Sequence, residues 1–526
     1  MLILEIVTIL LAGGALVAEF ARVLMTVQQN SYRPERYRRY LKTSGESTTF
    51  AHIFGIIVFL CMGLRFAPDW LKLGAVALFC LCMILRQARL TRTYKHPVVW
   101  TPRVWRLFST MCGLTVLVVG VALLLTEAGG AGYVTAGLLL LAWLLAPQVA
   151  QAALWLLKPV EKHINQRYID DARRILASMP DLRVVGITGS YGKTSTKHYL
   201  YRILSEQFPT CMTPGSFNTT LGVVRTIREH LKPFDRIFIC EMGAKQPGDV
   251  KEICDLVHPE IGIITAVGPQ HLESFKTIEN VQATKFELVD SLPAGGLAVL
   301  NDDFEYVANR PVSNVATVRY GIQPRPTVQY AAGEVKYSAN GTDFTIVGPD
   351  GELKLHTRLV GECNVSNLIA AVIVARHLGV TPERIAYAVE QIQQVEHRLS
   401  VRRTPGGLTV IDDAFNSNPA GSAMALDVLR SMTPGRRFVI TPGMIELGPE
   451  QEALNEAFGR KIAESADVAI IVGQYNREAI LAGLEGAQNC EVHAVDTFAQ
   501  AQSLMTSMAK AGDTVLYEND LPDTFK

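Results

Sequence analysis

Long apolar runs fill the first third of the chain, whereas the remainder has the pattern of an ordinary α/β protein. A helix needs roughly 20 apolar residues to cross a bilayer. The first, fourth and fifth runs reach this length, and the shorter second and third can form a tight helical hairpin. The pattern therefore predicts an α-helical transmembrane region of about five helices over residues 1–158. The runs cover about 2–26, 48–65, 70–86, 105–126 and 133–157.

Basic residues in the connecting loops predict how this region is oriented. The loop after the first run contains Arg33 to Lys42, the loop after the third contains Arg86 to Arg106, and both are rich in arginine. The loop at 126–133 has no basic residue. By the positive-inside rule the two basic loops are cytoplasmic, and five crossings then place everything after Lys158 in the cytoplasm. We expect an anchor, or alternatively helices that help to hold a lipid-linked substrate. We expect no ionisable residue deep inside a run, which argues against a transport pathway.

From residue 181 onward, strand and helix patterns alternate, which is typical of parallel, doubly wound α/β domains. We place an ATP-binding domain at about 160–396, with a β-rich stretch at 315–360, and a smaller Rossmann-like domain at 397–526. Hairpin turns are predicted at Asn340-Gly341 and Asp350-Gly351. The predicted fold class is therefore a helical transmembrane region followed by α/β, with a parallel-sheet P-loop domain and a Rossmann-like C-terminal domain.

Composition gives no indication of a nucleic-acid-binding protein or of a zinc protein. The formal net charge is +0, so nothing global indicates nucleic-acid binding. The nine cysteines show no paired metal-ligand spacing, so we expect no zinc site and interpret them as reduced thiols in a cytosolic environment.

A phosphate-binding loop follows the short β-branched strand predicted at 181–188. The next residues read Gly-Ser-Tyr-Gly-Lys-Thr-Ser, and a helix pattern comes after them. Glycines let backbone N–H groups approach phosphate oxygens, and the start of the helix adds a positive dipole. In a P-loop, Lys193 reaches the β- and γ-phosphates and the Thr194 hydroxyl binds Mg²⁺. Position 187 is isoleucine, so the match is to the variant T-G-x-x-G-K-T-[ST]. The nucleotide contacts expected here are Gly189, Ser190, Gly192, Lys193, Thr194 and Ser195.

This variant loop resembles that of the Mur ligase family, which joins amino acids or peptides to bacterial cell-wall precursors. Further segments over about 181–520 resemble the family in the same order. They are most similar to its MurF branch, which adds D-alanyl-D-alanine to the muramoyl tripeptide. The segments are Ser216–Gly222, Ile239–Ala244, Ile263–Gly268, His271–Phe275, Ala283–Glu287, Asn301–Asp303, Gly361–Asn367, His397–Leu399, Val410–Pro419 and Gly443–Gly448.

The resemblance implies a site for ATP and two Mg²⁺ ions. Glu241, which ends a buried strand, takes the family role of a Mg²⁺ ligand beside Thr194, and His271 that of a ligand of the second Mg²⁺. Lys285 lies in a segment resembling A-x-K-x-E, in which the family lysine is carbamylated and its negative charge supports the second metal. Arg398 clamps the γ-phosphate when the last domain closes.

Polar residues in the same segments are implied to contact the nucleotide and the substrates. Cys363 replaces a family histidine near the adenine, and Phe415 replaces a family tyrosine. The implied nucleotide contacts are Asn301, Asn364, Asn367 and Asp412. The implied substrate contacts are Asn218, Thr219, Asn416 and Asn418, of which the last two face the amine.

Forming an amide from a carboxylate explains why these residues are needed. A carboxylate oxygen is a poor leaving group, so ATP first converts the acid into an acyl-phosphate, which the amine then attacks. Bringing a carboxylate to a triphosphate is mainly a matter of positioning and charge neutralisation, which two Mg²⁺ ions, Lys193 and Arg398 would supply. Domain closure would keep water from the acyl-phosphate. We expect an ATP-dependent carboxylate–amine ligase that acts on a peptidoglycan-type precursor peptide at the cytoplasmic membrane face.

Two segments depart from the MurF pattern. Membrane helices and a connector at 161–179 stand in place of the family's UDP-sugar-binding domain, and residues 516–522 replace its K-G-S segment. We therefore expect a lipid-linked or otherwise membrane-proximal acceptor rather than a soluble UDP-muramoyl peptide. The alternatives are a membrane-bound poly-γ-glutamate-type ligase, a non-ligase membrane ATPase and a non-catalytic scaffold. The MurF-like segments argue against the first, the lack of transporter or sensor motifs against the second, and the intact set of charged residues against the third.

Overall fold

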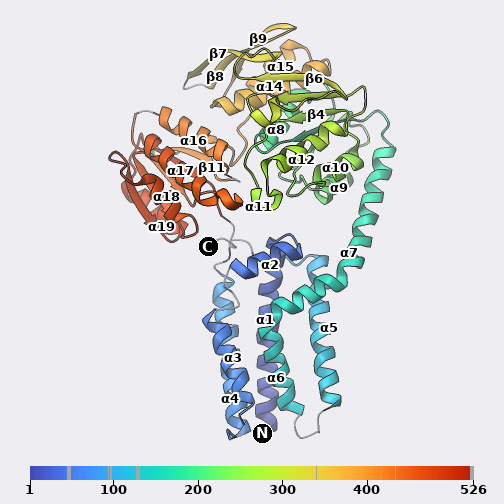
Figure 1. Ribbon diagram of the computed structural model, residues 1–526, viewed down its shortest axis with the longest axis vertical. Helices are drawn as coiled ribbons and strands as arrows, with labels where there is room; N and C mark the ends of the chain where they lie inside the picture. Colours follow the sequence, from blue (N-terminus) through green and yellow to red (C-terminus); the bar gives the residue numbers. More distant parts are fainter. Residues whose placement is uncertain are drawn as a thin grey trace. The chain divides into compact units, whose positions relative to one another are not determined.

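The computed structural model describes residues 1–43, 49–64, 66–92, 94, 97–125, 131–338, 341–415, 417–432 and 434–521. The chain forms two compact units (Figure 1). The helical unit comprises Met1–Ile164 together with the C-terminal stretch from Leu521, and the α/β unit comprises Asn165–Asp520.

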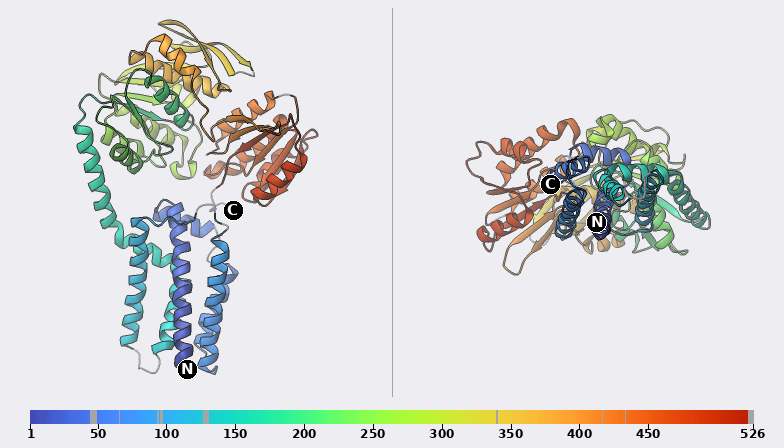
Figure 2. Two further views of the ribbon diagram at one scale, coloured as in Figure 1. Left: turned by 180° about the vertical axis from the view of Figure 1, so that it is seen from behind. Right: turned by 90° about the horizontal axis from the view of Figure 1, so that it is seen from below.

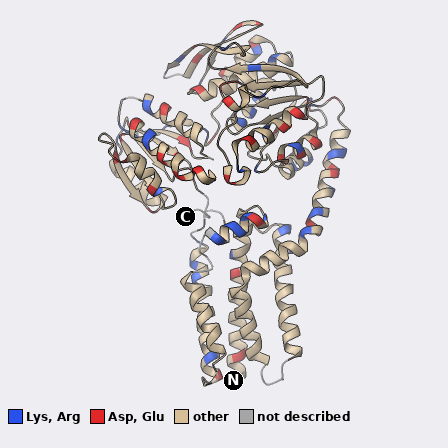
Figure 3. Cartoon of the chain, viewed as in Figure 1, with Lys and Arg blue, Asp and Glu red and all other residues tan. Residues whose placement is uncertain are grey.

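Apolar helices packed around α1 make up the helical unit (Figures 1 and 2). The interior is built from large side chains such as Phe20, Phe79 and Trp143, and the rings of the last two meet edge to face at 5.2 Å. Charged side chains are sparse along the long helices and frequent in α2 (Figure 3). The helices are α1 (Leu2–Gln29), α2 (Pro34–Thr43), α3 (Phe50–Met62), α4 (Asp69–Leu90), α5 (Pro102–Leu124), α6 (Ala131–Leu144) and α7 (Ala146–Ala177).

The number of helices that can cross a membrane differs from the predicted five. Within the described residues α1, α4 and α5 are long and apolar enough to span, and α6 with α7 qualifies only as a pair that is bent by 78°. The third apolar run is longer than predicted, because α4 has 22 residues, whereas α3 has 13. Three spans keep the odd number on which the predicted orientation depends, and four do not.

A charged pair lies inside α1, so the expectation of no ionisable residue within a run was wrong. The side chains of Glu19 and Arg22 are 5% and 9% exposed, and Arg22 Nε lies 3.0–3.1 Å from both carboxylate oxygens of Glu19. Residues three apart share one face of a helix, so the two charges neutralise each other within the bundle. The mean hydropathy of the run does not reveal the pair, because the other residues are strongly apolar.

The first sheet of the α/β unit has nine strands within the described residues, in the order β2-β3-β1-β4-β5-β6-β7-β8-β9. Strands β2 to β7 pair in parallel, and β7, β8 and β9 form an antiparallel meander. The predicted turn at Asp350-Gly351 is confirmed between β8 and β9, and Asn340 lies outside the described residues. The strands are β1 (Arg183–Thr188), β2 (Thr210–Met212), β3 (Ile237–Glu241), β4 (Ile261–Ile264), β5 (Leu297–Asn301), β6 (Ala316–Gly321), β7 (Tyr330–Ser338), β8 (Gly341–Gly348) and β9 (Gly351–Thr357).

Helices cover both faces of this sheet and bury a core on each (Figure 1). One core lies under α8, α14 and α15, and the other under α9, α10 and α12. Most of α14 is buried, which fits its uninterrupted run of apolar residues. The helices are α8 (Lys193–Leu204), α9 (Thr220–Glu229), α10 (Asp249–Val257), α11 (Leu272–Phe275), α12 (Ile278–Asp290), α13 (Glu305–Ala308), α14 (Glu362–His377) and α15 (Pro382–Glu390).

The C-terminal part of the α/β unit is a second sheet in the order β10-β11-β15-β12-β13-β14. Only the edge strand β10 is antiparallel to its neighbour among the described strands, so this part is a doubly wound α/β layer and the predicted fold class is confirmed. The strands are β10 (Ser400–Arg403), β11 (Thr409–Asp413), β12 (Arg437–Thr441), β13 (Val468–Val472), β14 (Glu491–Val495) and β15 (Thr514–Glu518). The helices are α16 (Pro419–Ser431), η3 (Gly448–Glu450), α17 (Gln451–Ser465), α18 (Arg477–Leu484) and α19 (Phe498–Met508).

Candidate active site

The predicted phosphate loop connects the central strand β1 to α8. Gly189 has φ of +152° and Gly192 has φ of +77°, and a Cβ at Gly192 would overlap the side-chain oxygen of Asn367. Only glycine fits such tight positive-φ positions, so the backbone rather than side chains forms the concave surface. Ser190 is fixed from the side because its hydroxyl lies 3.1 Å from both the N–H and the C=O of Gly268. The loop is therefore a rigid cradle at the start of a helix.

Lys193 is the first residue of α8 and lies back along this loop. Its Nζ donates to the carbonyls of Gly189 at 2.6 Å and Ser190 at 3.3 Å. Burial lowers the pKa of Lys193 to about 8, with Glu241 opposing and Arg398 adding to the effect. The ammonium thus lies among carbonyl groups where a phosphate would compete for it.

Glu241 is the centre of the polar cluster beside the loop. It ends β3, is 1% exposed, and accepts from Thr194 Oγ1 at 3.3 Å and from Asn218 Nδ2 at 3.0 Å through Oε1. Burial on its own would raise the pKa of Glu241, but Lys197 and Lys193 outweigh it and hold this pKa below its ordinary value. A buried carboxylate thus remains ionised next to the phosphate loop.

Lys197 is a site residue that the sequence analysis missed. It is 0% exposed, and its Nζ donates to Gly215 O at 2.6 Å and lies 2.9 Å from Glu241 Oε2, outside hydrogen-bond alignment with that oxygen. Lys197 follows Lys193 by four residues and therefore lies on the same side of α8, which is the one signal in the sequence that points to it.

Lys285 on α12 is 2% exposed, and the described residues offer its Nζ no hydrogen-bond partner. Burial, together with the nearby charge of Lys193, lowers the pKa of Lys285 to about 7 against the opposing effect of Asp249 and Glu287. A lysine in this state is a partly neutral amine, which is the nucleophilic form.

His271 contacts the C-terminal part of the unit. It has φ of +53° just before α11, and its Nδ1 hydrogen-bonds to the carboxylate of Glu446, which has φ of +63°. Burial lowers the pKa of His271, although Glu446 opposes this shift. The sequence predicted a metal role for His271 and no role for Glu446; the metal role stays a prediction.

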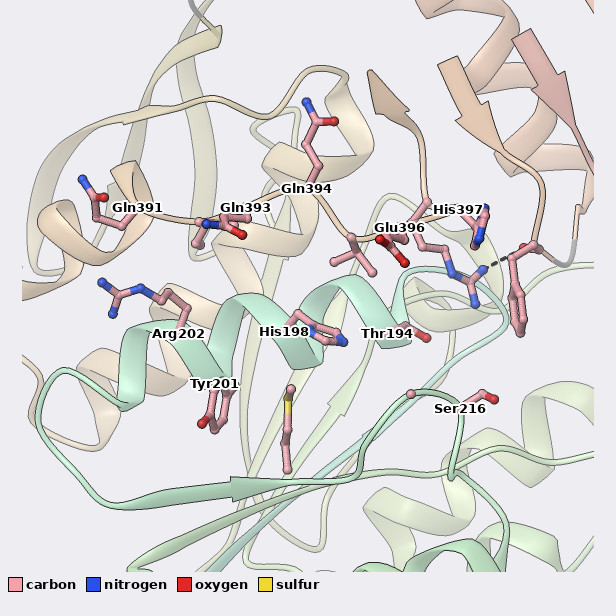
Figure 4. Close-up of a pocket in the computed structure, with 16 residues that line it drawn as sticks. Thr194, His198, Tyr201, Arg202, Ser216, Gln391, Gln393, Gln394, Glu396 and His397 are labelled. Carbon is pink, nitrogen blue, oxygen red and sulfur yellow. Dashed lines mark hydrogen bonds between the residues drawn. The ribbon is translucent and has the colours of Figure 1, made fainter. Parts of the chain in front are cut away.

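Arg398 lies beside the phosphate loop and is held by Phe415. Its Nη1 donates to Phe415 O at 2.9 Å, and its guanidinium lies 4.5 Å from the centre of the Phe415 ring. Arg398, Phe415 and Thr194 line the same cavity, shown in Figure 4. Burial lowers the pKa of Arg398, with Asp413 and Glu241 opposing, and the group remains a cation.

The asparagines expected at the nucleotide lie next to the loop and hydrogen-bond within the protein. Asn367 Oδ1 accepts from Thr196 at 3.1 Å, and Asn364 Oδ1 accepts from Tyr199 at 2.7 Å. Asn301 Nδ2 donates to Thr265 O at 2.9 Å and to Ser366 at 3.1 Å. These bonds attach α8 and β5 to α14, so the contacts account for a structural role, and the nucleotide role stays a prediction.

Several residues predicted to contact the substrates or the nucleotide act as helix caps or as hinge contacts. The Thr219 hydroxyl accepts from Gly222 N at the start of α9, and Asn418 Oδ1 accepts from Gly421 N at the start of α16. Asp412 Oδ2 lies 2.9 Å from His397 Nδ1. Asn416 lies outside the described residues. Ser195 is buried within α8.

The residues of the cluster are suited to Mg²⁺ bound together with phosphate. No group of three or more His, Cys, Asp or Glu that could hold a metal occurs among the described residues. Mg²⁺ typically takes only one or two protein carboxylates and completes its shell with phosphate oxygens and water. Thr194 and Glu241 supply such a partial set, because their bond is long and Glu241 Oε2 accepts no aligned hydrogen bond from a described residue. The donor set therefore fits the ion.

The fold and the site define a P-loop α/β protein whose second α/β part brings an arginine to the phosphate loop. The family model of the Mur ligase middle domain matches residues 187–375, and that of the Mur ligase glutamate ligase domain matches residues 397–517. The chain belongs to the Mur ligase family and is an ATP-dependent ligase that forms amide bonds.

The curated relatives of this chain are ligases of one name from different bacteria. The chain is 31% identical over 359 residues to the UDP-N-acetylmuramoyl-tripeptide–D-alanyl-D-alanine ligase of Mycobacterium bovis, covering 64% of this chain and 70% of that protein. It is 26% identical over 344 residues to the Bacillus subtilis ligase of this name, covering 64% and 72%.

Solved structures agree with these relatives. The structure of MurF ligase from Thermotoga maritima with ADP matches with a TM-score of 0.62 at 25% identity, covering 68% of this chain and 80% of that one. A MurF structure from Acinetobacter baumannii matches with a TM-score of 0.61 at 26% identity, covering 67% and 77%. The MurF resemblance drawn from the sequence is therefore confirmed.

Proposed function

We propose that this ligase joins a D-alanyl-D-alanine-type amine to the peptide of a peptidoglycan precursor at the cytoplasmic face of the membrane. The observation that supports this most directly is the convergence of Thr194, Asn218 and Lys197 on the buried Glu241, with Arg398 on the same cavity. This arrangement collects positive charge around one carboxylate next to a phosphate cradle. It suits a reaction in which a carboxylate must approach a triphosphate.

In this proposal the phosphate loop and Lys193 bind the ATP phosphates, and Arg398 offsets negative charge on the transferred phosphoryl group. Thr194 and Glu241 would hold one Mg²⁺, and His271 would hold a second that a carbamylated Lys285 supports; the ions would supply charge neutralisation. The acid oxygen attacks the γ-phosphorus and ADP leaves. The amine nitrogen then attacks the acyl carbon, loses a proton, and phosphate leaves.

Lys285 fits the proposed carbamate chemistry. Its neutral amine would attack the carbon of CO₂ and lose a proton, giving a carbamate anion in place of a cation. The buried position, the lack of a hydrogen-bond partner among the described residues and a pKa of about 7 all favour the neutral amine. An anion at this point would lower the repulsion among Lys193, Lys285 and any bound cation.

The apolar helices support a membrane-proximal acceptor. Three helices meet the length and composition of membrane spans, or four with the bent pair counted. They occupy the part of the chain before the Mur ligase domains, where the family's UDP-sugar-binding domain would lie. A lipid-linked muramoyl peptide is therefore the acceptor that we propose, with membrane lipids around the helical unit.

The test uses the full-length protein in lipid nanodiscs with ATP, Mg²⁺ and D-alanyl-D-alanine. A lipid-linked muramoyl tripeptide and the UDP-linked tripeptide are offered separately, and ADP release is measured together with product mass. Ligation of the lipid-linked form at higher kcat/KM supports the proposal. Ligation of the UDP form alone would overturn the membrane-proximal part, and ATP-dependent addition of glutamate to a polymer would overturn the choice of substrate.

A further inference from the structure

The basic residues of the helical unit gather at one end of the bundle (Figure 3). Residues 30–49 contain four arginines and one lysine against Glu35 and Glu46, and residues 86–106 contain five arginines and one lysine with no acidic residue. The parts of the chain at the other end, residues 1–10, 63–72 and 124–133, carry two basic and three acidic side chains. The excess of positive charge therefore belongs to the end at which α2 lies.

Side-chain contacts hold several helices together at this end. Gln28 near the end of α1 hydrogen-bonds through both of its amide atoms to the backbone of Val99, just before α5. Arg38 on α2 donates from Nε to Gln151 Oε1 on α7 at 3.0 Å. Basic side chains thus surround one end of the bundle, and we call them the basic collar. The collar consists of the arginines and lysines in residues 33–42, 86–92, 103–106 and 158–162.

Arg103 and Arg106 at the start of α5 are the part of the collar that is fixed most firmly. Glu161 on α7 is 8% exposed and lies between them, because Arg106 Nε donates to its Oε1 at 2.7 Å and Arg103 Nε lies 3.4 Å from its Oε2. The guanidinium of Arg103 also lies 4.1 Å from the centre of the Tyr32 ring. Both arginine side chains keep about a third of their surface exposed. Two oriented guanidinium groups that share one carboxylate therefore leave one net positive charge open to an anion.

Exposed tryptophans and the length of α5 indicate the level at which these arginines lie in a bilayer. Trp100 and Trp105 are both exposed, and their ring centres lie 4.7 Å apart. Beyond Arg106, α5 has no charged residue. The eighteen steps from Arg106 to Leu124 rise about 27 Å, close to the roughly 30 Å of a hydrocarbon core. Tryptophan and arginine at the end of an apolar helix are typical of the head-group level.

We propose that the basic collar binds anionic phospholipids, with the phosphate of one head group held by Arg103 and Arg106. The proposal rests on the membrane location in the proposed function and adds a class of lipid partner. Planar guanidinium groups match the geometry of phosphate oxygens. Lys158 and Lys162 on α7 are exposed and lie within one turn of Glu161, so they add positive charge for neighbouring head groups.

The surroundings of the collar favour a phospholipid over other polyanions. The basic side chains encircle the end of an apolar bundle and lie next to exposed tryptophans, whereas a nucleic acid needs a polar surface along which its backbone can lie. At the arginine pair itself, the single net charge equals the one negative charge of a phosphodiester. A diphosphate carries more negative charge than this pair neutralises.

The test compares the binding of two lipids to the full-length protein in detergent. Native mass spectrometry with palmitoyl-oleoyl phosphatidylglycerol and with phosphatidylcholine of the same chains gives the ratio of their dissociation constants. The wild-type protein should prefer the anionic lipid. Each basic residue near an anionic surface contributes roughly fivefold. Lys42→Gln, Lys158→Gln and Lys162→Gln together, all at exposed positions, should therefore lower the preference by roughly tenfold or more.

A second variant tests the arginine pair, and a third serves as the control. Arg103→Gln, Arg106→Gln and Glu161→Gln together remove the net charge without leaving a buried carboxylate unpaired, and should lower the preference roughly fivefold. Lys72→Gln, near the other end of α4, removes a cation outside the collar and should leave the preference unchanged. The melting temperature identifies a variant that fails to fold. If the arginine variant does so, the variant of the three exposed lysines decides the test.

Four results would overturn the inference. The first is equal binding of the two lipids by the wild-type protein, and the second is an unchanged preference in both collar variants. The third is displacement of phosphatidylglycerol by glycerol phosphate, which would reveal a site for a soluble phosphate. The fourth is tighter binding of a polyprenyl diphosphate that is lost in the arginine variant, which would assign the collar to the carrier of the lipid-linked substrate.

Reconstitution into nanodiscs of phosphatidylcholine alone separates this inference from the proposed function. A protein that does not enter these nanodiscs would contradict both the membrane part of the proposed function and the lipid site. A protein that enters them and shows no preference for the anionic lipid would contradict the lipid site alone. Ligation is assayed in the same nanodiscs, and its absence in a protein with the expected lipid preference would contradict only the proposed function.

Discussion

His271 Nδ1 hydrogen-bonds to the carboxylate of Glu446, which joins the loop before α11 to the segment before η3. Both residues have positive φ, and Glu273 N also donates to Glu446 O at 3.3 Å. Non-glycine residues at positive φ cost free energy and persist only where their surroundings hold them. With the Nδ1 proton directed at a carboxylate, the Nε2 lone pair of His271 is free for a cation.

Glu446→Gln should therefore raise the Mg²⁺ concentration needed for half-maximal ligation. A carboxylate that orients a metal-binding histidine typically contributes 10- to 100-fold in metal affinity. Activity is measured over a Mg²⁺ titration, with Glu450→Gln, an exposed neighbour, as the control. An unchanged Mg²⁺ requirement with a lower melting temperature would show that the contact serves only to hold the two parts of the unit together.

Lys193→Ala should abolish ATP-dependent ligation while leaving membrane insertion intact. The ammonium lies at the carbonyls of the phosphate loop, where no other described lysine hydrogen-bonds, so its loss removes the proposed charge on the β- and γ-phosphates. A fall in kcat of roughly 10²- to 10³-fold or more is expected. Lys510→Ala is the exposed control, and full ligation by Lys193→Ala would refute the role.

A double-mutant cycle separates the structural from the catalytic part of Glu241. Lys197→Met leaves Glu241 buried without its ion pair and should lower the free energy of unfolding by about 3–5 kcal/mol. Adding Glu241→Gln removes the unpaired charge and should recover part of that loss. Chemical denaturation of the α/β unit within the full chain measures the stability change, and ligation is assayed in parallel.

Ligase activity should remain absent in the Lys197→Met, Glu241→Gln variant even where its stability recovers. The proposed Mg²⁺ site has lost its carboxylate in this variant, whatever the state of the fold. If activity returned together with stability, Glu241 would have only a structural role, and the metal site would have to be placed elsewhere.

The main features of this site could be predicted because local sequence determines them. β1 and β3 are short runs of β-branched and apolar residues that end at a glycine turn and at Glu241, and carboxyl ends of neighbouring parallel strands meet at one edge of a sheet. The glycines at 189 and 192 likewise predict a tight loop before a helix, and both have positive φ in the structure.

The missed residues depend on contacts between distant parts of the chain. The spacing from Lys193 points to Lys197, but its pairing with Glu241 depends on how α8 packs on β3. The contact of Glu446 with His271 likewise depends on how the C-terminal part meets the segment before α11. The pair of Glu19 and Arg22 escaped notice for a different reason, because hydropathy averaging over a long apolar run hides two neighbouring opposite charges. The pattern of apolar and polar residues predicts helices and strands and where they end. It does not predict which side chains from distant parts of the chain pair with each other.

Ligation should weaken as the pH falls through about 7, because Lys285 must be neutral to hold a carbamate. Burial lowers its pKa to about 7, so the amine is mostly neutral above this pH and becomes protonated below it. Protonation reverses the addition of CO₂ and restores a cation where an anion is needed. ¹³C-bicarbonate labelling followed by NMR should show a carbamate signal at pH 8 that declines toward pH 6.

Lys285→Ala should lose both the signal and the activity, and added short carboxylic acids should partly restore activity by supplying an anion in the space left. Lys276→Ala, an exposed lysine beyond α11, is the control. A wild-type protein with full activity at pH 8 and no carbamate signal would show that Lys285 acts as an amine.

Arg398→Lys should lower kcat with little change in the KM for ATP. Arg398 is held by the carbonyl and the ring of Phe415, a geometry that depends on the planar guanidinium, and a lysine ammonium cannot reproduce both contacts. If the arginine acts on charge that develops during phosphoryl transfer, its replacement affects the transition state more than ground-state ATP binding. A fall in kcat and in kcat/KM by similar factors is therefore expected, measured by ADP release at saturating acid and amine.

Phe415→Ala should give a smaller loss of the same kind, because the cation remains and only its orientation is relaxed, whereas Phe415→Tyr keeps the ring and should retain activity. A raised KM for ATP with unchanged kcat in Arg398→Lys would instead assign the arginine to nucleotide binding in the ground state.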